Sequence, residues 1–188
     1  MVTVLEVLAE EASTCTSCGL AVGRTNVVFG AGSSAADLMF VGEGPGARED
    51  EQGVPFVGRS GQLLDRLLAE ELGIDRTDCY ITNVVKCRPP ENRDPRPDEI
   101  AACRPYLEQQ VALVDPAVIV TLGNFSSKLL LETDVGITKL RGRSYRFGDP
   151  ERHLVPTFHP AAALRGGADV LARMRADLVR AKVLMGDR

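Results

Sequence analysis

Short apolar runs alternate along this chain with segments of helical spacing, and this alternation constrains the fold more than any other feature. The apolar runs are typical of buried strands and cover residues 37–41, 79–85, 117–122 and 154–158. The helical segments cover residues 1–13, 61–72, 98–114, 125–131 and 170–185. Strands that alternate with helices favour a parallel sheet covered on both faces. The sequence therefore predicts an α/β fold with a parallel sheet of these strands between two helical layers.

Length, composition and charge exclude several classes of protein. With 188 residues and 44% hydrophobic content, the chain suits a single domain over residues 1–188. No apolar run approaches the roughly 18 residues of a membrane span, and the N-terminal region lacks the bases of a signal peptide, so we expect a cytoplasmic protein without membrane contact. The net charge of −4 argues against a nucleic-acid partner, although residues 136–165 carry an excess of bases that can attract a polyanion. Charge alone favours an ordinary solvated surface.

The predicted strands all end in residues that can bind or react. These are Gly42 to Gly46 after the first strand, Asn83 and Lys86 to Arg88 at the second, Gly123 and Asn124 after the third, and His159 and Pro160 after the fourth. Ligands of open parallel sheets bind beyond the carboxyl ends of the strands. We therefore expect the functional site at this edge of the sheet.

Cysteine spacing indicates a metal site rather than disulfides. Five cysteines are an odd number, and cytosolic thiols stay reduced. Cys15 and Cys18 form a C-x2-C pair, and Cys87 and Cys103 lie on either side of a proline-rich loop. Four thiolates suit zinc and a 4Fe–4S cluster equally well. Cys79 stands at the start of a strand, where a small buried apolar residue is usual, and we assign it no further role.

The glycine loop and the single residues Glu43, Phe56 and His159 also have ordinary structural interpretations. The loop from Gly42 to Gly46 lacks both the Lys-Ser/Thr ending of a P-loop and the spacing of GxGxxG, which disfavours a nucleotide cofactor. Glu43 suits a loop acid or helix cap, Phe56 suits core packing, and His159 suits a turn histidine with satisfied hydrogen bonds.

The ordered set of motifs resembles the family 4 uracil-DNA glycosylases, the iron–sulfur type of bacteria and archaea. The matching segments run from Cys15 to Arg165 and read GEGPGARED, GVPFVGRSGQLL, YITNVVKCRPPENRDP, ITKLRG and FHPAAALR, after the C-x2-C pair. The resemblance implies the uracil-DNA glycosylase fold, a three-layer αβα unit with a central four-stranded parallel sheet. It also implies a 4Fe–4S cluster on Cys15, Cys18, Cys87 and Cys103.

The resemblance further implies a uracil pocket built from Glu43, Gly44, Phe56, Asn83 and His159. In such a pocket Phe56 stacks on the extruded base, and the Asn83 amide pairs with uracil O4 and N3–H. His159 donates to uracil O2, where negative charge gathers as the glycosidic bond breaks. Glu43 positions the attacking water or stabilises the cationic sugar. By analogy with related enzymes, Glu49 crowds the methyl group of thymine.

The implied partner is uracil-containing DNA, double- or single-stranded, bound by a monomer associated with the nucleoid. Candidate DNA contacts are Lys86, Arg88, Arg93, Arg141, Leu164 and Arg165, of which Leu164 and Arg165 suit a minor-groove wedge. Two alternatives remain open. One is a relative that binds uracil-DNA covalently through a histidine in an inserted loop, and residues 129–141 contain neither insertion nor histidine. The other is a metal-stapled DNA-binding module without activity.

Overall fold

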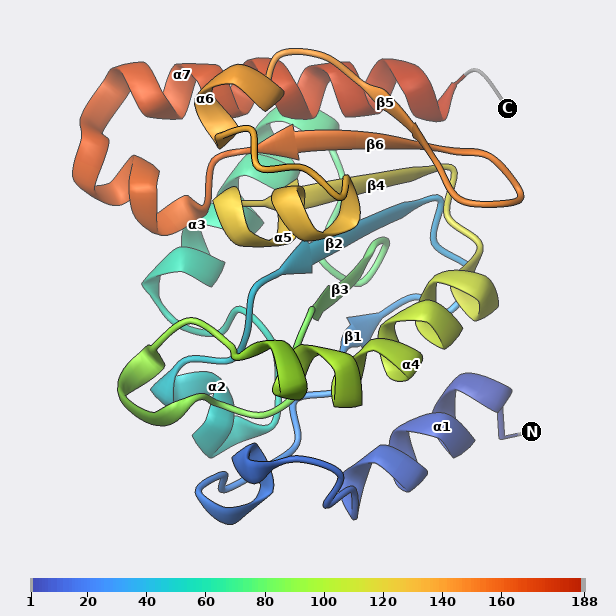
Figure 1. The fold of residues 1–188 in the computed structure, drawn as a ribbon. Coiled ribbons are helices and arrows are strands. Elements are labelled where there is room, and N and C mark those ends of the chain that lie inside the picture. Colours follow the sequence, from blue (N-terminus) through green and yellow to red (C-terminus); the bar gives the residue numbers. More distant parts are fainter. Residues whose placement is uncertain (1, 187–188) are drawn as a thin grey trace.

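A mixed sheet of six strands forms the centre of the molecule in the computed structural model, which describes residues 2–186 (Figure 1). The strand order is β1-β3-β2-β4-β6-β5. The four inner strands are parallel: β3 (Tyr80–Asn83), β2 (Leu38–Gly42), β4 (Val118–Leu122) and β6 (Arg152–Thr157). The predicted fold class is confirmed, since these four strands correspond to the four apolar runs of the sequence.

Two short edge strands extend the sheet beyond the prediction of four. They are β1 (Ala31–Gly32) and β5 (Tyr145–Phe147), and both pair antiparallel with their neighbours. At the β1 edge, a Cβ on Gly32 would lie 1.8 Å from the Cys79 carbonyl oxygen, so only glycine lets this strand approach β3. Neither edge strand contains a continuous apolar run, which explains why the sequence pattern did not reveal them.

Helices cover both faces of the sheet (Figure 1). On one face lie α3 (Arg59–Leu67), its π-helical continuation η2 (Leu68–Leu72) and α7 (Pro160–Met185). On the other lie α4 (Pro97–Val114) and α5 (Asn124–Leu130), with α1 (Val4–Ser13) packed outside α4. The remaining short helices are η1 (Gly19–Val22), α2 (Ala47–Gln52), η3 (Pro90–Asn92) and α6 (Ile137–Leu140). The closing helix begins earlier than predicted and is interrupted at Gly167, whose φ is 72°.

Alternation along the buried strands divides the core between the two faces. In β2, Leu38 and Phe40 pack with α3 and α7, whereas Met39 and Val41 pack with the α4 side. All four side chains are buried. Because both faces of the inner strands are covered, these strands are apolar without interruption.

No helix within residues 2–186 combines the length and the apolar character needed to span a membrane. Independent folding of residues 1–188 as one domain stays a prediction.

Candidate active site at the carboxyl ends of the strands

A cleft of about 700 Å³ opens beyond the carboxyl ends of β2, β3 and β6. The five residues predicted for the uracil pocket all line it: Glu43, Gly44, Phe56, Asn83 and His159. Further lining residues are Pro45, Gly46, Glu49, Gly58, Arg59, Ser60, Pro89, Asn92, Arg93, Asp94, Ala161 and Arg165. The expected convergence of strand ends therefore holds for these three strands. Asn124, after β4, instead accepts a hydrogen bond from the Ile137 N–H at the start of α6 (3.0 Å).

The Asn83 side chain carries an unsatisfied acceptor into this region. Asn83 is the last residue of β3 and only 1% exposed, yet its Oδ1 atom has no hydrogen-bond partner among the described residues. A Cβ on Gly42 would lie 2.3 Å from this oxygen and 2.7 Å from the Phe56 ring. Glycine at position 42 thus allows the amide and the ring to approach the same point of the chain. A buried acceptor without a donor costs free energy unless a ligand supplies one.

The Phe56 ring is held in the cleft by an unusual backbone conformation. Its φ is 52°, a left-handed value that is uncommon for a bulky residue. Arg76 fixes this turn by donating to the carbonyl oxygens of Phe56 (3.2 Å) and Pro55 (2.7 Å). A Cβ on Gly61 would lie 1.7 Å from the Phe56 carbonyl oxygen, so α3 needs glycine there. The ring centroid lies 5.7 Å from that of His159, which leaves two rings facing one cleft.

His159 is arranged as a neutral hydrogen-bond donor. It caps the N-terminus of α7, where its Nδ1 atom accepts from the Ala161 N–H at 3.1 Å. Burial lowers the pKa of His159 to about 4, and the positive charge of Arg165 adds to this shift while Glu49 opposes it. The imidazole is therefore neutral at neutral pH, and an Nδ1 acceptor leaves the ring proton on Nε2.

Glu43 faces a second acid across the cleft. Burial raises the pKa of Glu43 to about 7, and the neighbouring Asp94 contributes through its charge and a side-chain hydrogen bond. Asp94 comes from the loop between Cys87 and α4, and the sequence offered no signal for this pairing.

Gly44 lets the loop after β2 pass close to Val85, because a Cβ on Gly44 would lie 2.9 Å from the Val85 side chain.

Glu49 lies in the cleft wall, where its Oε1 atom accepts from the N–H groups of Val57 and Gly58, both at 3.0 Å. The carboxylate thus orders the turn that follows Phe56. Exclusion of thymine by Glu49 stays a prediction.

The four cysteines predicted to bind a metal line one small hollow, beside η1 and the N-terminal half of α4. All are free thiols: Cys15, Cys18, Cys87 and Cys103. The Lys86 N–H donates to Cys103 Sγ (3.2 Å), and the Arg24 guanidinium lies 3.5 Å from Cys87 Sγ. Among residues 2–186, no three histidine, cysteine or acidic side chains converge closely enough to hold a single metal ion. Cys79 lies in the core, as expected of a small apolar residue.

Lys86 does not face solvent, which corrects its prediction as a DNA contact. The residue is 1% exposed. Its Nζ atom donates to Thr82 Oγ1 (2.8 Å), the Asn83 carbonyl oxygen (2.6 Å) and Gln110 Oε1 (2.5 Å). A phosphate group cannot reach an ammonium whose three protons are all donated inside the protein.

Arg141 is also engaged mainly inside the protein, which argues against its prediction as a DNA contact. Its guanidinium donates to both carboxylate oxygens of the buried Asp177, each at 2.8 Å, and lies over the Phe158 ring. Its side chain is only 14% exposed. This arginine ties the end of α6 to α7.

The other predicted DNA contacts lie at or near the surface and stay predictions. Arg93 lines the cleft and pairs with Glu99, whereas Arg88 donates to Asn92 Oδ1 at 2.8 Å. Leu164 is 44% exposed, and Arg165 is exposed at the rim of the cleft.

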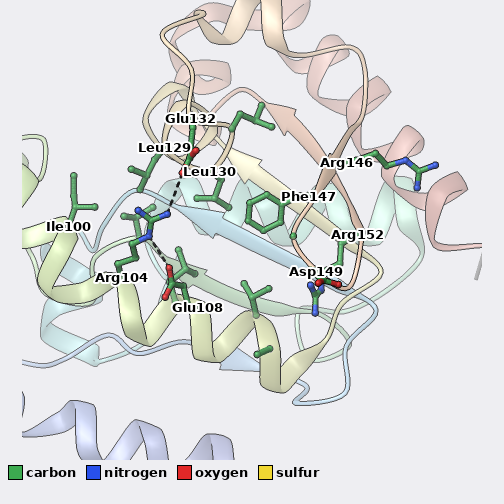
Figure 2. Close-up of a pocket in the computed structure, with 16 residues that line it drawn as sticks. Ile100, Arg104, Glu108, Leu129, Leu130, Glu132, Arg146, Phe147, Asp149 and Arg152 are labelled. Carbon is green, nitrogen blue, oxygen red and sulfur yellow. Dashed lines mark hydrogen bonds and ion pairs between the residues drawn. The ribbon is translucent and has the colours of Figure 1, made fainter.

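A second hollow, of about 490 Å³, lies over the other face of the sheet between α4, α5 and the loop after β5 (Figure 2). Its lining is largely apolar, with Leu129, Leu130 and Phe147 pointing inward (Figure 2). At its rim, Arg104 pairs with Glu108 at 2.9 Å and with Glu132 at 3.6 Å. We call this hollow the apolar groove.

Comparison with known proteins shows the family of the chain. The profile of the uracil DNA glycosylase superfamily matches residues 29–180. A type-4 uracil-DNA glycosylase of Sulfurisphaera tokodaii is 50% identical over 166 residues, which cover 85% of this chain and 76% of the relative. Another, of Thermotoga maritima, is 46% identical over 171 residues, or 90% of this chain and 88% of the relative. A type-5 uracil-DNA glycosylase of Thermus thermophilus is 31% identical over 152 residues, covering 70% and 68%.

The chain belongs to the uracil-DNA glycosylase superfamily. Within it, the similarity to type-4 members extends over most of the chain and confirms the family inferred from the motifs. The interpretation of the chain as a DNA-repair enzyme is confirmed at this level.

Proposed function

We propose that this chain hydrolyses the N-glycosidic bond of uracil that has been extruded from DNA, releasing uracil and leaving an abasic site. The observation that carries the proposal is the buried Asn83 Oδ1 atom, which has no partner among residues 2–186 and lies in a cleft also lined by Phe56 and His159. An acceptor fixed at this point suits the N3–H of uracil, whereas cytosine presents an acceptor at N3. Phe56 supplies the face on which the flat ring stacks.

Leaving-group stabilisation falls to His159. As the bond between N1 and C1′ breaks, the bonding electrons go to the base, and negative charge gathers at uracil O2. A neutral imidazole with its proton on Nε2 can donate a hydrogen bond to that oxygen. Water supplies the hydroxyl group that forms the new bond at C1′.

We assign Glu43 a role at the sugar rather than at the base. Its carboxylate orients the attacking water or stabilises the positive charge that develops on the sugar. Since the pKa of Glu43 is raised to about 7, the ionised form required for either role is present above neutral pH. The half-buried Arg88 and Arg93 and the exposed Leu164 and Arg165 suit contacts with the DNA around the extruded nucleotide.

The cysteine site fits a 4Fe–4S cluster. Four free thiols line one hollow, a donor set that suits a 4Fe–4S cluster, and the resemblance to the iron–sulfur type of glycosylase favours this cluster over zinc. The N–H group of Lys86 and the guanidinium of Arg24 are suited to compensate the charge of the thiolates. A bound cluster would order the N-terminal segment and the loop before α4. We infer that Cys15, Cys18, Cys87 and Cys103 hold it.

The test uses a uracil-containing oligonucleotide, single-stranded or paired with G or A. After incubation, alkali should cleave the strand at the former uracil. An adduct that resists SDS would instead support the covalent relative, although only residues 131–136, without histidine, separate α5 from α6. Binding with neither outcome would support the DNA-binding module and overturn the proposed activity.

An Asn83→Asp variant sharpens the test. Burial favours a protonated acid at this position, which can donate to N3 of cytosine and accept from its amino group. We expect most uracil release to be lost and a weak release of cytosine to appear, stronger at lower pH. Wild-type uracil release by this variant would mean that Asn83 does not recognise the base.

The chain is further proposed to act as a monomer in the cytoplasm, at the nucleoid. Light scattering during size-exclusion chromatography checks the monomer, and a dimer mass would contradict it.

A further inference from the structure

Lys86 is a buried lysine whose side-chain amino group bonds only to neutral oxygens among the described residues. Its three ammonium protons are directed at Thr82 Oγ1, the Asn83 carbonyl oxygen and Gln110 Oε1, at 2.8, 2.6 and 2.5 Å. A buried lysine is costly unless its hydrogen bonds and charge are compensated, so a shorter or apolar side chain would be the simpler solution for core packing. The position of this lysine between two functional regions offers a reason for its presence.

The residue connects the base-recognition strand to the cysteine site. Its side chain folds back onto the end of β3 and holds the main chain of Asn83, the residue with the unpartnered Oδ1 atom. Its main-chain N–H donates to Cys103 Sγ at 3.2 Å, and the next residue is Cys87. β3 ends at Asn83, and the chain beyond it is held by single main-chain hydrogen bonds, from Val84 N–H to the Gly42 carbonyl oxygen (3.0 Å) and from Val85 N–H to that of Glu43 (3.1 Å).

A closed network anchors the lysine from the opposite side. The Thr82 hydroxyl donates to the Phe29 carbonyl oxygen at 2.8 Å. Gln110, from α4, donates to the same carbonyl at 2.8 Å and to the Tyr80 hydroxyl at 3.1 Å. These bonds fix the Thr82 and Gln110 side chains that accept from Lys86, so the lysine is held by two elements, β3 and α4. Removing it would leave three buried acceptors without this donor.

We propose that Lys86 is a positioning residue for uracil recognition, which sets the backbone of Asn83 and couples it to the cysteine site. The proposal rests on the glycosylase function proposed above. Lys86 touches neither the base nor the sugar, and it acts by holding the end of β3 so that the Asn83 amide meets the base at the right distance and angle. A shift of about 1 Å in such a group costs about 10²-fold in rate.

The test compares Lys86→Met with Lys182→Met, which removes an exposed lysine of α7 on the far side of the sheet. Each protein is assayed for bound iron, thermal unfolding and affinity for DNA containing an abasic-site analogue. Single-turnover release of uracil is then measured per iron-loaded molecule. We expect Lys86→Met to retain affinity for the analogue, which presents no base to Asn83, while its rate of uracil release falls by about 10²-fold. Lys182→Met should match the wild type.

The outcomes separate this proposal from the proposed function. If the wild type releases no uracil, the glycosylase function itself fails. If the wild type is active and Lys86→Met keeps its rate per iron-loaded molecule, Lys86 does not position Asn83. Should Lys86→Met fail to fold, Thr82→Val removes one acceptor of the ammonium at nearly constant volume. We then expect a loss of about 10-fold at wild-type iron content, and an unchanged rate overturns the proposal.

Discussion

The cleft and the apolar groove differ less in size than in how their polar groups are satisfied. In the groove, Arg104 pairs with Glu108 and Glu132 (Figure 2). Arg152 pairs with Asp115, although its Nε atom has no hydrogen-bond partner within residues 2–186. In the cleft, Asn83 Oδ1 has no partner within residues 2–186, and Glu43 faces another acid. Stability alone favours the first arrangement, because an unpaired buried group costs about 1–3 kcal/mol. What distinguishes the cleft is that its unpaired acceptor stands beside an aromatic ring and a histidine, Phe56 and His159, an arrangement that suits a flat polar ligand.

The same contrast separates Asn83 from its neighbour Lys86. The side chains of both are buried at the end of β3, but every donor of Lys86 has an acceptor, whereas the Asn83 acceptor awaits a donor. At this strand end, the satisfied side chain of Lys86 holds the scaffold, and we expect the side chain of Asn83 to meet the substrate.

The largest expected effect in the cleft comes from His159→Ala. Because the hydrogen bond of His159 strengthens only as uracil gains charge, single-turnover cleavage should fall by about 10²–10³-fold. Affinity for uracil-containing DNA should remain close to that of the wild type. Single-turnover rates and binding curves measure both quantities. A variant weakened mainly in affinity would make His159 a DNA contact and break the comparison.

The strands and their terminal residues could be predicted from the sequence because burial on both faces demands continuous apolar runs. Which cations are buried could not be predicted. Lys86 follows a strand end, but it is enclosed because its side chain folds back onto β3 and meets Gln110 from α4, a contact between distant segments that the sequence does not reveal. The role of Asp94 was hidden for a similar reason, since its approach to Glu43 depends on how the loop before α4 folds.

Glu43→Gln should have an intermediate effect on activity and alter its dependence on pH. In the wild type, the Glu43 carboxylate forms as the pH rises through about 7, so the rate of uracil release should rise in this range. The pKa of His159, about 4, is too low to cause such a rise. The glutamine variant should be about 10-fold slower, and its rate should not rise with pH near neutrality. Rates of uracil release between pH 5 and pH 9 test this, and a limb near pH 7 that persists in the variant would assign it to another group.

The free energy of unfolding of Glu43→Gln should differ from that of the wild type in a way that depends on pH. The folded-state pKa of Glu43 is raised from 4.5 to about 7, so its contribution to folding is fully present below 4.5 and is lost as the pH rises through 7. At pH 8, Glu43→Gln should therefore be more stable than the wild type by about 1 kcal/mol, allowing for solvent screening of a half-buried group. At pH 4 the difference should vanish. Urea denaturation at both pH values measures it.

Arg104→Met, at the rim of the apolar groove, should have the smallest effect. Both acids that pair with Arg104 are exposed, so its removal leaves no buried charge without a partner. Surface ion pairs contribute about 0–1 kcal/mol, and the free energy of unfolding should change by no more than this. Uracil release should stay within about twofold of the wild type, since the rim lies over the opposite layer from the cleft residue Phe56. Denaturation curves and single-turnover rates measure both quantities. A loss of uracil release approaching that of His159→Ala would show that the groove also takes part in DNA processing. The functional contrast between the cleft and the groove would then fail.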